Sequence, residues 1–122
     1  MELHTLSMIE YVDAIKQKKF TATEGVKHFS NRIKNDHRNA VLEVFDSALS
    51  SAQKLDEKIK RGEPLGRLCG ACIIIKDNVL YEGHKMTVAS KMLSNFVSPY
   101  SATIVEKMLA EDAIILGRAN MD

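Results

Sequence analysis

The sequence predicts an α/β fold, with N-terminal helices followed by β-α-β units of a mixed, largely parallel sheet that has helices on both faces. Two apolar runs without polar alternation, at 71–75 and 113–116, are typical of strands covered on both sides. Between them, apolar residues at helical spacing follow Ser101 and Thr103. A strand, a helix and a strand in this order are typical of a parallel crossover.

Two capping-box signatures predict helices in the N-terminal part. Ser7 with Glu10, and Thr21 with Glu24, place a hydroxyl three residues before a carboxylate, the pattern that satisfies backbone groups at a helix start. Each signature is followed by apolar residues at helical spacing, namely Met8, Ile9, Val12 and Ile15, then Ala22, Val26, Phe29 and Ile33. We therefore expect a helical hairpin over 1–38, and the start of the α/β core over 39–122.

The middle of the chain predicts further elements of this core. Residues 39–45 are rich in strand formers. Asp46 is expected to cap a third helix that ends at Gly62, and Gly117 is expected to stop the last strand. A short helix is expected around 90–96. The side chains predicted to face inward are Leu49, Ala52, Leu55 and Ile59 in the third helix, and Ile104, Val105, Met108 and Leu109 in the fourth.

Length and charge limit the possible functions. The chain has 122 residues, enough for one modest domain, which we place at 1–122. Its 17 basic and 16 acidic side chains leave a formal net charge of +1, which gives no electrostatic case for a nucleic-acid or membrane surface. No apolar run approaches the roughly 18 residues of a membrane span. The N-terminus has no basic n-region, so we expect no signal peptide and a cytoplasmic location.

Two cysteines at C-x-x-C spacing raise the question of a thiol or metal site. A thioredoxin-like motif should open a helix, whereas Cys72 leads into an isoleucine strand. A tetrahedral zinc site needs two more ligands, and the four histidines show no ligand-pair spacing. We expect Cys69 and Cys72 to be small buried hydrophobic residues around a glycine turn, reduced and without a metal.

Lys76 follows the apolar run directly and is the main candidate for chemistry. A charged residue in this place either leaves the core for solvent, which is the more common outcome, or is held at the edge of the core. In open α/β sheets, active sites lie beyond the carboxyl ends of the strands. A desolvated, near-neutral lysine there can act as a general base. Asp77 and Asn78 are expected to hold the turn, since Asx side chains bond nearby backbone amides.

Several stretches of the sequence resemble the amidase signature family. They are Ile75-Lys-Asp-Asn-Val79, Ala89-Ser-Lys-Met-Leu93, Asn95-Phe-Val-Ser-Pro-Tyr100, Ala102-Thr-Ile-Val-Glu-Lys107 and Ala113-Ile-Ile-Leu-Gly-Arg-Ala-Asn-Met-Asp122. The resemblance is densest over 66–122. Within the family, A-S-K-M-L and N-M-D resemble most the branch of glutamyl-tRNA(Gln)/aspartyl-tRNA(Asn) amidotransferases.

The resemblance implies a serine hydrolase with a triad of a nucleophilic serine, a second serine on a cis peptide bond, and a lysine base that matches Lys76. Both serines belong to a Gly/Ser-rich segment that in the family follows N-M-D. The chain therefore carries one third of the triad, reads as the front part of a longer protein, and is expected to be inactive alone. Ser90 lies in a family-like stretch, where a contact to substrate is possible and a structural role is the alternative.

The resemblance also implies partners. The complete enzyme would hydrolyse glutamine and pass ammonia to an activated aminoacyl-tRNA, in a heterotrimer with a tRNA-binding kinase subunit and a small wrapping subunit. This chain would bind no cofactor, because ATP and Mg²⁺ belong to the kinase step on the partner. The sequence departs from the family at Cys72, Ile74 and Val88, which replace a proline, a glycine and a cysteine. Two alternatives remain open: a shortened non-catalytic paralogue that binds an assembly partner, and an amidase for small amides.

Overall fold

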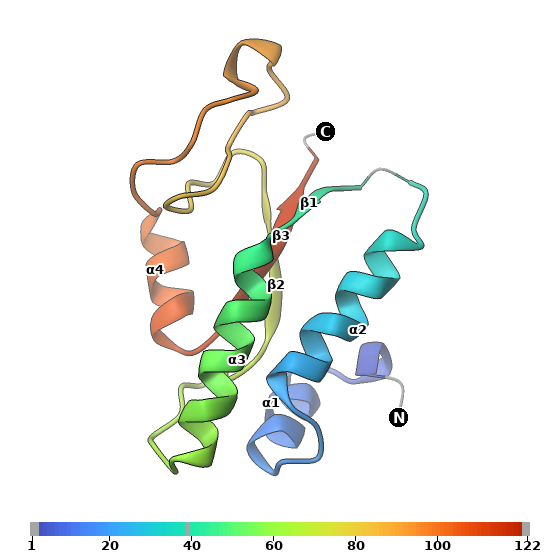
Figure 1. The fold of residues 1–122 in the computed structure, drawn as a ribbon, viewed down its shortest axis with the longest axis vertical. Coiled ribbons are helices and arrows are strands. Elements are labelled where there is room, and N and C mark those ends of the chain that lie inside the picture. The colour runs from blue at the N-terminus through green and yellow to red at the C-terminus, as the bar shows by residue number, and fades with distance from the viewer. Residues whose placement is uncertain (1–2, 39, 121–122) are drawn as a thin grey trace.

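The computed structural model of the chain describes residues 3–38 and 40–120. It contains helices interleaved with three strands (Figure 1). In chain order, the elements are η1 (Leu3–Thr5), α1 (Met8–Lys16), α2 (Ala22–Lys34), β1 (Val41–Val44), α3 (Asp46–Lys60), β2 (Cys72–Lys76), η2 (Lys91–Leu93), α4 (Thr103–Ala110) and β3 (Ile114–Ala119).

The three strands form one mixed sheet in the order β1-β3-β2. β2 runs parallel to β3, in a register that begins with Cys72 opposite Ile114 and ends with Lys76 opposite Ala119. β1 pairs with the other edge of β3 and runs antiparallel to it. Since α4 lies in the crossover between β2 and β3, the β-α-β unit and the predicted α/β class are confirmed.

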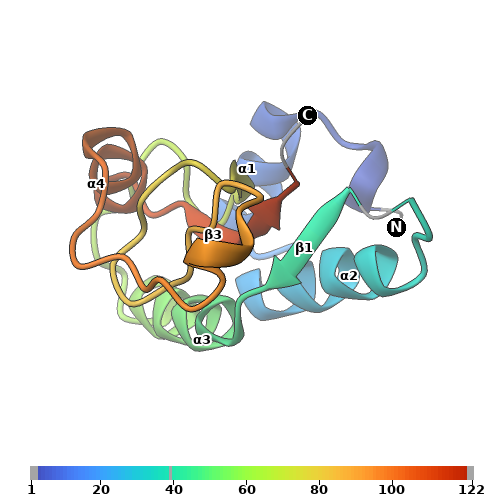
Figure 2. The ribbon, with the colours of Figure 1, turned by 90° about the horizontal axis from the view of Figure 1, so that it is seen from above.

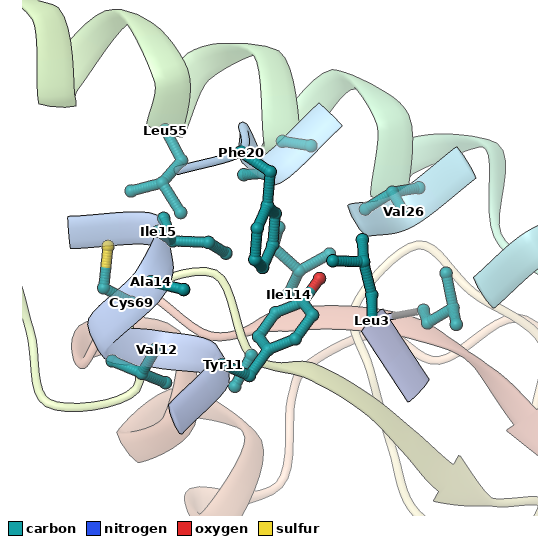
Figure 3. Close-up of a cluster of buried hydrophobic side chains, with 14 of the residues drawn as sticks. Leu3, Tyr11, Val12, Ala14, Ile15, Phe20, Val26, Leu55, Cys69 and Ile114 are labelled. Atoms are coloured by element: carbon teal, nitrogen blue, oxygen red, sulfur yellow. The ribbon is translucent and has the colours of Figure 1, made fainter. Parts of the chain in front are cut away.

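Helices cover both faces of the sheet because alternate residues of β3 enter two different cores. Ile114 and Leu116 belong to the larger cluster, which α1, α2 and α3 complete (Figure 3). Ile115 belongs to a smaller cluster with Val105 of α4 and Phe45. Seen from above, α4 and α2 lie at opposite ends of the molecule, with β3 between them (Figure 2). β3 is therefore the element on which both hydrophobic cores are built.

The helix starts confirm two predictions and correct a third. Both capping boxes form: the Ser7 and Thr21 side chains accept from the amides of Glu10 and Glu24, whose carboxylates accept from the capping residues' own amides. Asp46 is not a cap, because Phe45 occupies the N-cap position of α3 and makes no side-chain cap bond. Asp46 lies in the first turn instead, where its negative charge interacts favourably with the positive end of the helix dipole.

Two glycines at predicted element ends behave differently. Gly62 follows α3 in the left-handed conformation, with φ of +70°, as predicted for a helix end. Gly117 was predicted to stop the last strand and this is wrong, since β3 continues to Ala119. A Cβ atom at position 117 would lie 2.2 Å from the carbonyl oxygen of Glu43. Gly117 is therefore needed for the close approach of β1 to the central strand.

Other predictions were wrong at the level of single elements. Ile74 is 40% exposed, because β2 lies at an edge of the described sheet and is not covered on both faces. Leu49 and Ile104, expected to face inward, are 37% and 61% exposed, since each is one position off the buried stripe of its helix. The helix expected around 90–96 is the short η2. None of the helices within 3–38 and 40–120 has the length and apolar character that a membrane span requires.

Candidate active site

The candidate site lies where the parallel strands β2 and β3 end. Lys76 is the last residue of β2, stands opposite Ala119, and is exposed in this chain. The next amide, that of Asp77, donates to the Ala119 carbonyl oxygen over 3.0 Å and extends the strand pairing by one bond. The long segment between β2 and α4 rises above this end of the sheet (Figure 1). The position agrees with the prediction for Lys76, and the described chain alone does not desolvate the lysine.

Asp77 is buried and its carboxylate is surrounded by donors. The side chain is 0% exposed. One carboxylate oxygen, Oδ1, accepts from the Thr87 amide at 2.9 Å and from Arg118 Nη1 at 2.8 Å. The other, Oδ2, accepts from the Thr87 hydroxyl and, at 3.4 Å, from the Ala89 amide. The carboxylate therefore connects the end of β2 to the loop at 87–89 and to β3.

The buried carboxylate stays charged. Burial raises the pKa of Asp77, because it removes water from the ionised form. The hydrogen bonds from Thr87, Ala89 and Arg118 outweigh burial, so that the pKa of Asp77 lies below its ordinary value. Burial lowers the pKa of Arg118, and the contacts with Glu43 and Asp77 more than compensate. The two groups therefore form an ion pair at neutral pH.

The loop adopts an unusual backbone conformation to reach Asp77. Val88 and Ala89 have φ values of +51° and +57°, in the left-handed region that costs about 1–2 kcal/mol for a residue with a Cβ atom. In this conformation the Val88 amide donates to the Asp77 carbonyl oxygen over 3.0 Å, while the amides of Thr87 and Ala89 point at the carboxylate. Successive amides that converge in this way form an anion-binding concavity. Here the anion is the chain's own Asp77.

Arg118, on β3, links Asp77 to Glu43 of β1. Its side chain is 11% exposed, and its Nε donates to Glu43 Oε1 of β1 over 2.9 Å while Nη1 binds Asp77. Sequence reasoning missed Arg118 and Thr87. The available signal was an arginine near the end of a buried apolar strand, since a buried cation requires a partner. Nothing in the sequence named Thr87, because its contact spans a loop.

Asn78 and Ser90 are less involved than Asp77. Asn78 is exposed in the turn after β2, and within the described ranges its side chain has no hydrogen-bond partner. The turn is closed by the backbone, since the Val79 amide donates to the Lys76 carbonyl oxygen over 3.0 Å. The Asp77 side chain instead binds amides ten and twelve residues away, in the loop at 87–89. Ser90 precedes η2 without a side-chain cap bond, and its amide donates to the Thr87 carbonyl oxygen over 2.8 Å. Ser90 thus lies in the same loop as Thr87 and Ala89, which donate hydrogen bonds to Asp77. A contact of Ser90 with substrate stays a prediction.

A second polar cluster anchors the far side of the loop. Ser47 Oγ of α3 lies 2.6 Å from His84 Nε2, and His84 Nδ1 lies 2.8 Å from the Glu82 carbonyl oxygen. A carbonyl only accepts, so Nδ1 carries a hydrogen, and in the neutral imidazole Nε2 accepts from the Ser47 hydroxyl. The imidazole also stacks on Tyr81, with ring centroids 3.8 Å apart. The segment is therefore tied to α3 as well as to the sheet.

The two cysteines lie away from this site, at the start of β2. Cys69 is buried, and Cys72 Sγ lies 3.8 Å from the Tyr11 hydroxyl. Gly70 between them has φ of +78°. Burial raises the pKa of Cys72 to about 11, and it also raises the pKa of Cys69. Within 3–38 and 40–120, no three His, Cys, Asp or Glu side chains come together in a way that could hold a metal ion.

Comparison with known proteins agrees with this arrangement. The Amidase family matches residues 24–122, which include the whole sheet and the Lys76–Asp77 turn. The chain belongs to the amidase family. The resemblance inferred from I-K-D-N and the neighbouring stretches is therefore confirmed.

The curated relatives are glutamyl-tRNA(Gln) amidotransferase A subunits. The protein of Fusobacterium nucleatum is 46% identical over 123 residues, which are 98% of this chain and 25% of that protein. The protein of Thermoanaerobacter pseudethanolicus is 44% identical over 125 residues, 100% of this chain and 25% of that protein. The chain thus spans about a quarter of the length of the curated relatives it matches.

Solved structures with this fold are amidase signature enzymes. A bacterial aryl acylamidase superposes with a TM-score of 0.89 at 29% identity, over 94% of this chain and 25% of its own. An amidase family protein from Bacillus anthracis superposes with a TM-score of 0.87 at 27% identity, over 98% of this chain and 25% of its own. The α/β architecture is therefore shared with the amidase family beyond the tRNA-dependent branch.

The Asp77–Arg118 pair should make stability depend on pH. Because the pKa of Asp77 is lowered by folding, its contribution is present above the unfolded value, about 3.9, and is lost as the pH falls through the lower folded value. Asp77→Asn should lower the free energy of unfolding at pH 7 by about 3 kcal/mol and flatten its decline below pH 4. Urea denaturation between pH 2.5 and 7 measures both effects.

Glu63→Gln provides the matched control. Glu63 is 45% exposed and pairs with Arg61, which is 60% exposed, so its loss should change stability by less than about 0.5 kcal/mol. An Asp77→Asn change that is no larger than this control would contradict the assignment of Asp77 as a buried ionic link.

The cysteines should be unreactive in the folded chain. Since the thiolate is the nucleophile, raising the pKa of Cys72 from 9.0 to about 11 should slow its reaction with a thiol reagent by roughly 100-fold at neutral pH. Labelling with and without urea measures the difference. Equal rates in both conditions, or one equivalent of tightly bound zinc, would show that the pair is a reactive or metal-binding site.

Proposed function

We propose that Lys76 is the general base of an amidase and that this chain forms the front part of a glutaminase subunit of a tRNA-dependent amidotransferase. The observation that carries the proposal is the position of Lys76 at the carboxyl end of a parallel strand, followed by a buried carboxylate that binds the loop at 87–89 and Arg118 of β3. Family membership and the A-subunit relatives support it.

In the proposed mechanism, Lys76 acts on two serines that this chain does not supply. The neutral lysine draws a proton through the serine on the cis peptide bond from the nucleophilic serine. The activated hydroxyl attacks the glutamine side-chain amide, ammonia leaves, and water then hydrolyses the acyl-enzyme. Lys76 is exposed in this chain, so in the proposed enzyme other parts of the domain would have to bury it and remove water from its ammonium group.

The proposed setting is a cytoplasmic heterotrimer. A tRNA-binding kinase subunit would use ATP and Mg²⁺ to activate the aminoacyl-tRNA, and a small third subunit would wrap this one. The alternatives are an amidase for small amides, which the aryl acylamidase structure favours, and a non-catalytic binding module.

Replacing Lys76 tests the proposal in an assembled subunit, in which residues 1–122 take the place of the matching quarter of the Fusobacterium nucleatum relative. Lys76→Ala should reduce glutamine hydrolysis by more than 10⁴-fold, since loss of a general base typically costs 10² to 10⁴-fold and a coupled triad loses more. Amidation with free ammonia should persist, because the partner's chemistry does not use this lysine. Measuring both activities separates the two steps.

Lys76→Arg serves as the charge-preserving control. It should fail as well, because a guanidinium does not deprotonate at working pH. Glutamine-dependent activity within about tenfold of the parent after Lys76→Ala would mean that the lysine is a solvent-facing strand end. Hydrolysis of small amides without any glutamine hydrolysis would favour the second candidate function.

The 122-residue chain alone should release no ammonia from glutamine. Triad members act as a unit, and neither of the two expected serines lies within the matching stretch of this sequence. An ammonia-release assay on the purified chain tests this. Turnover that survives purification and disappears with Lys76→Ala would overturn the triad assignment.

A further inference from the structure

The two edges of the described sheet differ in how open they are to a further strand. β1 is four residues long, contains Glu43, and has a register shift between Val41 and Glu43. Short length, a charge and a bulge are features by which proteins protect a sheet edge from further pairing. β2 reads Cys-Ile-Ile-Ile-Lys, with no charge before Lys76, and its own register shift places the extra residue, Leu116, on β3. The edge at β1 is therefore protected, and the edge at β2 is not.

The backbone of β2 presents alternate residues to this open edge. The Ala71 carbonyl oxygen accepts from the Ile114 amide over 2.8 Å, and the Asp77 amide donates to β3 over 3.0 Å. Because the backbone groups of successive strand residues point to opposite sides, the odd-numbered residues of this segment face β3. The amides and carbonyls of Cys72 and Ile74 therefore face the other side, where the part of the chain that the structure describes places no further strand.

A groove of about 350 Å³ lies between β2 and α2. Its apolar lining consists of Phe29, Ile33, Cys72, Ile74 and Leu116, and the remaining lining residues are charged and come from α2 and the residues after it. Cys72 and Ile74 line the same groove because strand residues two apart share a face. Ile74 is 40% exposed, whereas Ile75 on the opposite face is 6% exposed and belongs to the cluster with α4. β2 is therefore apolar on both faces and covered well on only one.

The length of the related proteins indicates what could cover this surface. The aryl acylamidase superposes on this chain over 25% of its own length, so about three quarters of that amidase lies outside the matched region. The same share holds for the curated A subunits. A strand with a near-continuous apolar run is typical of the interior of a sheet, with neighbours on both sides. The run at 71–75 has this character, although the described sheet places it at an edge.

We propose that β2 is an interior strand of the complete amidase domain, and that its free edge and the groove beside it bind a strand from the part of the domain outside these 122 residues. That strand would pair with the backbone of Cys72 and Ile74 and place apolar side chains in the groove. This assignment rests on the proposed function, in which the chain is the front part of a longer subunit. It adds the surface on which the rest of the domain docks.

Two matched substitutions test the two edges, Ile74→Lys on β2 and Leu42→Lys on β1. The parent side chains are 40% and 42% exposed, so in the 122-residue chain each change should shift the thermal midpoint by less than about 3 °C. In the assembled subunit, with the rest of the Fusobacterium nucleatum relative attached, Ile74→Lys should lower the midpoint by more than about 5 °C, because the ammonium is buried without a partner. Leu42→Lys should stay within about 2 °C there, since β1 remains a sheet edge.

Hydrogen exchange provides a second measurement that needs no substitution. Mass spectrometry compares the 122-residue chain with the assembled subunit. The amides of 72–76 should exchange at least about tenfold more slowly in the assembled subunit, because a new strand pairs with them. The amides of 41–44 should change by less than about threefold, because their edge gains no neighbour.

The docking surface would be refuted if the assembled subunit tolerated Ile74→Lys, or if both substitutions lowered its midpoint equally. A 122-residue chain that dimerises, and that Ile74→Lys turns into a monomer while the assembled subunit tolerates the change, would assign the surface to a second copy instead. Neither measurement uses glutamine hydrolysis. If Lys76→Ala retains activity while Ile74→Lys still destabilises the assembled subunit, the proposed function fails and the docking surface stands.

Discussion

The buried ion pair between Asp77 and Arg118 joins every element at the upper end of the sheet. Asp77 directly follows β2, Arg118 lies on β3, and Glu43 extends the chain of charges to β1. The same carboxylate holds the loop at 87–89 in a left-handed conformation that would otherwise be unfavourable. These side-chain contacts add to the backbone pairing of β1, β3 and β2 and to the bond from the Val88 amide to the Asp77 carbonyl oxygen.

Below this edge, stability comes from β3. Its alternating side chains feed two hydrophobic clusters, one shared with α1, α2 and α3 and the other with α4. Gly117 allows β1 to approach closely, directly beside Arg118. The packing of the core and the placement of the buried charge therefore depend on the same short strand. This links the hydrophobic core to the site, since a shift of β3 would move Arg118 and with it the end of β2.

The arrangement suits an amidase because the paired strand end that carries Lys76 is separate from the mostly irregular segment between β2 and α4. Lys76 and Asp77 are set by strand pairing and by buried hydrogen bonds. The segment from Tyr81 to Tyr100 is mostly irregular, yet it is tied at His84 to α3 and at Thr87 to Asp77. A side chain at the end of a paired strand, with an anchored loop above it, is a scaffold on which substrate contacts can vary. A bacterial aryl acylamidase shares the fold of this region.

The sequence by itself determined the starts of α1 and α2, the two parallel strands and the place of Lys76, because these depend on local signals. Capping boxes act over three residues, and apolar runs are read directly from composition. Only the tertiary structure decided that β2 lies at an edge, that Gly117 continues its strand, and that Asp77 is bound by Thr87 and Arg118. Those outcomes depend on contacts between residues that are ten to seventy-five positions apart. Periodicity carries no information about such partners, since they meet only once the strands have paired and the loop has closed.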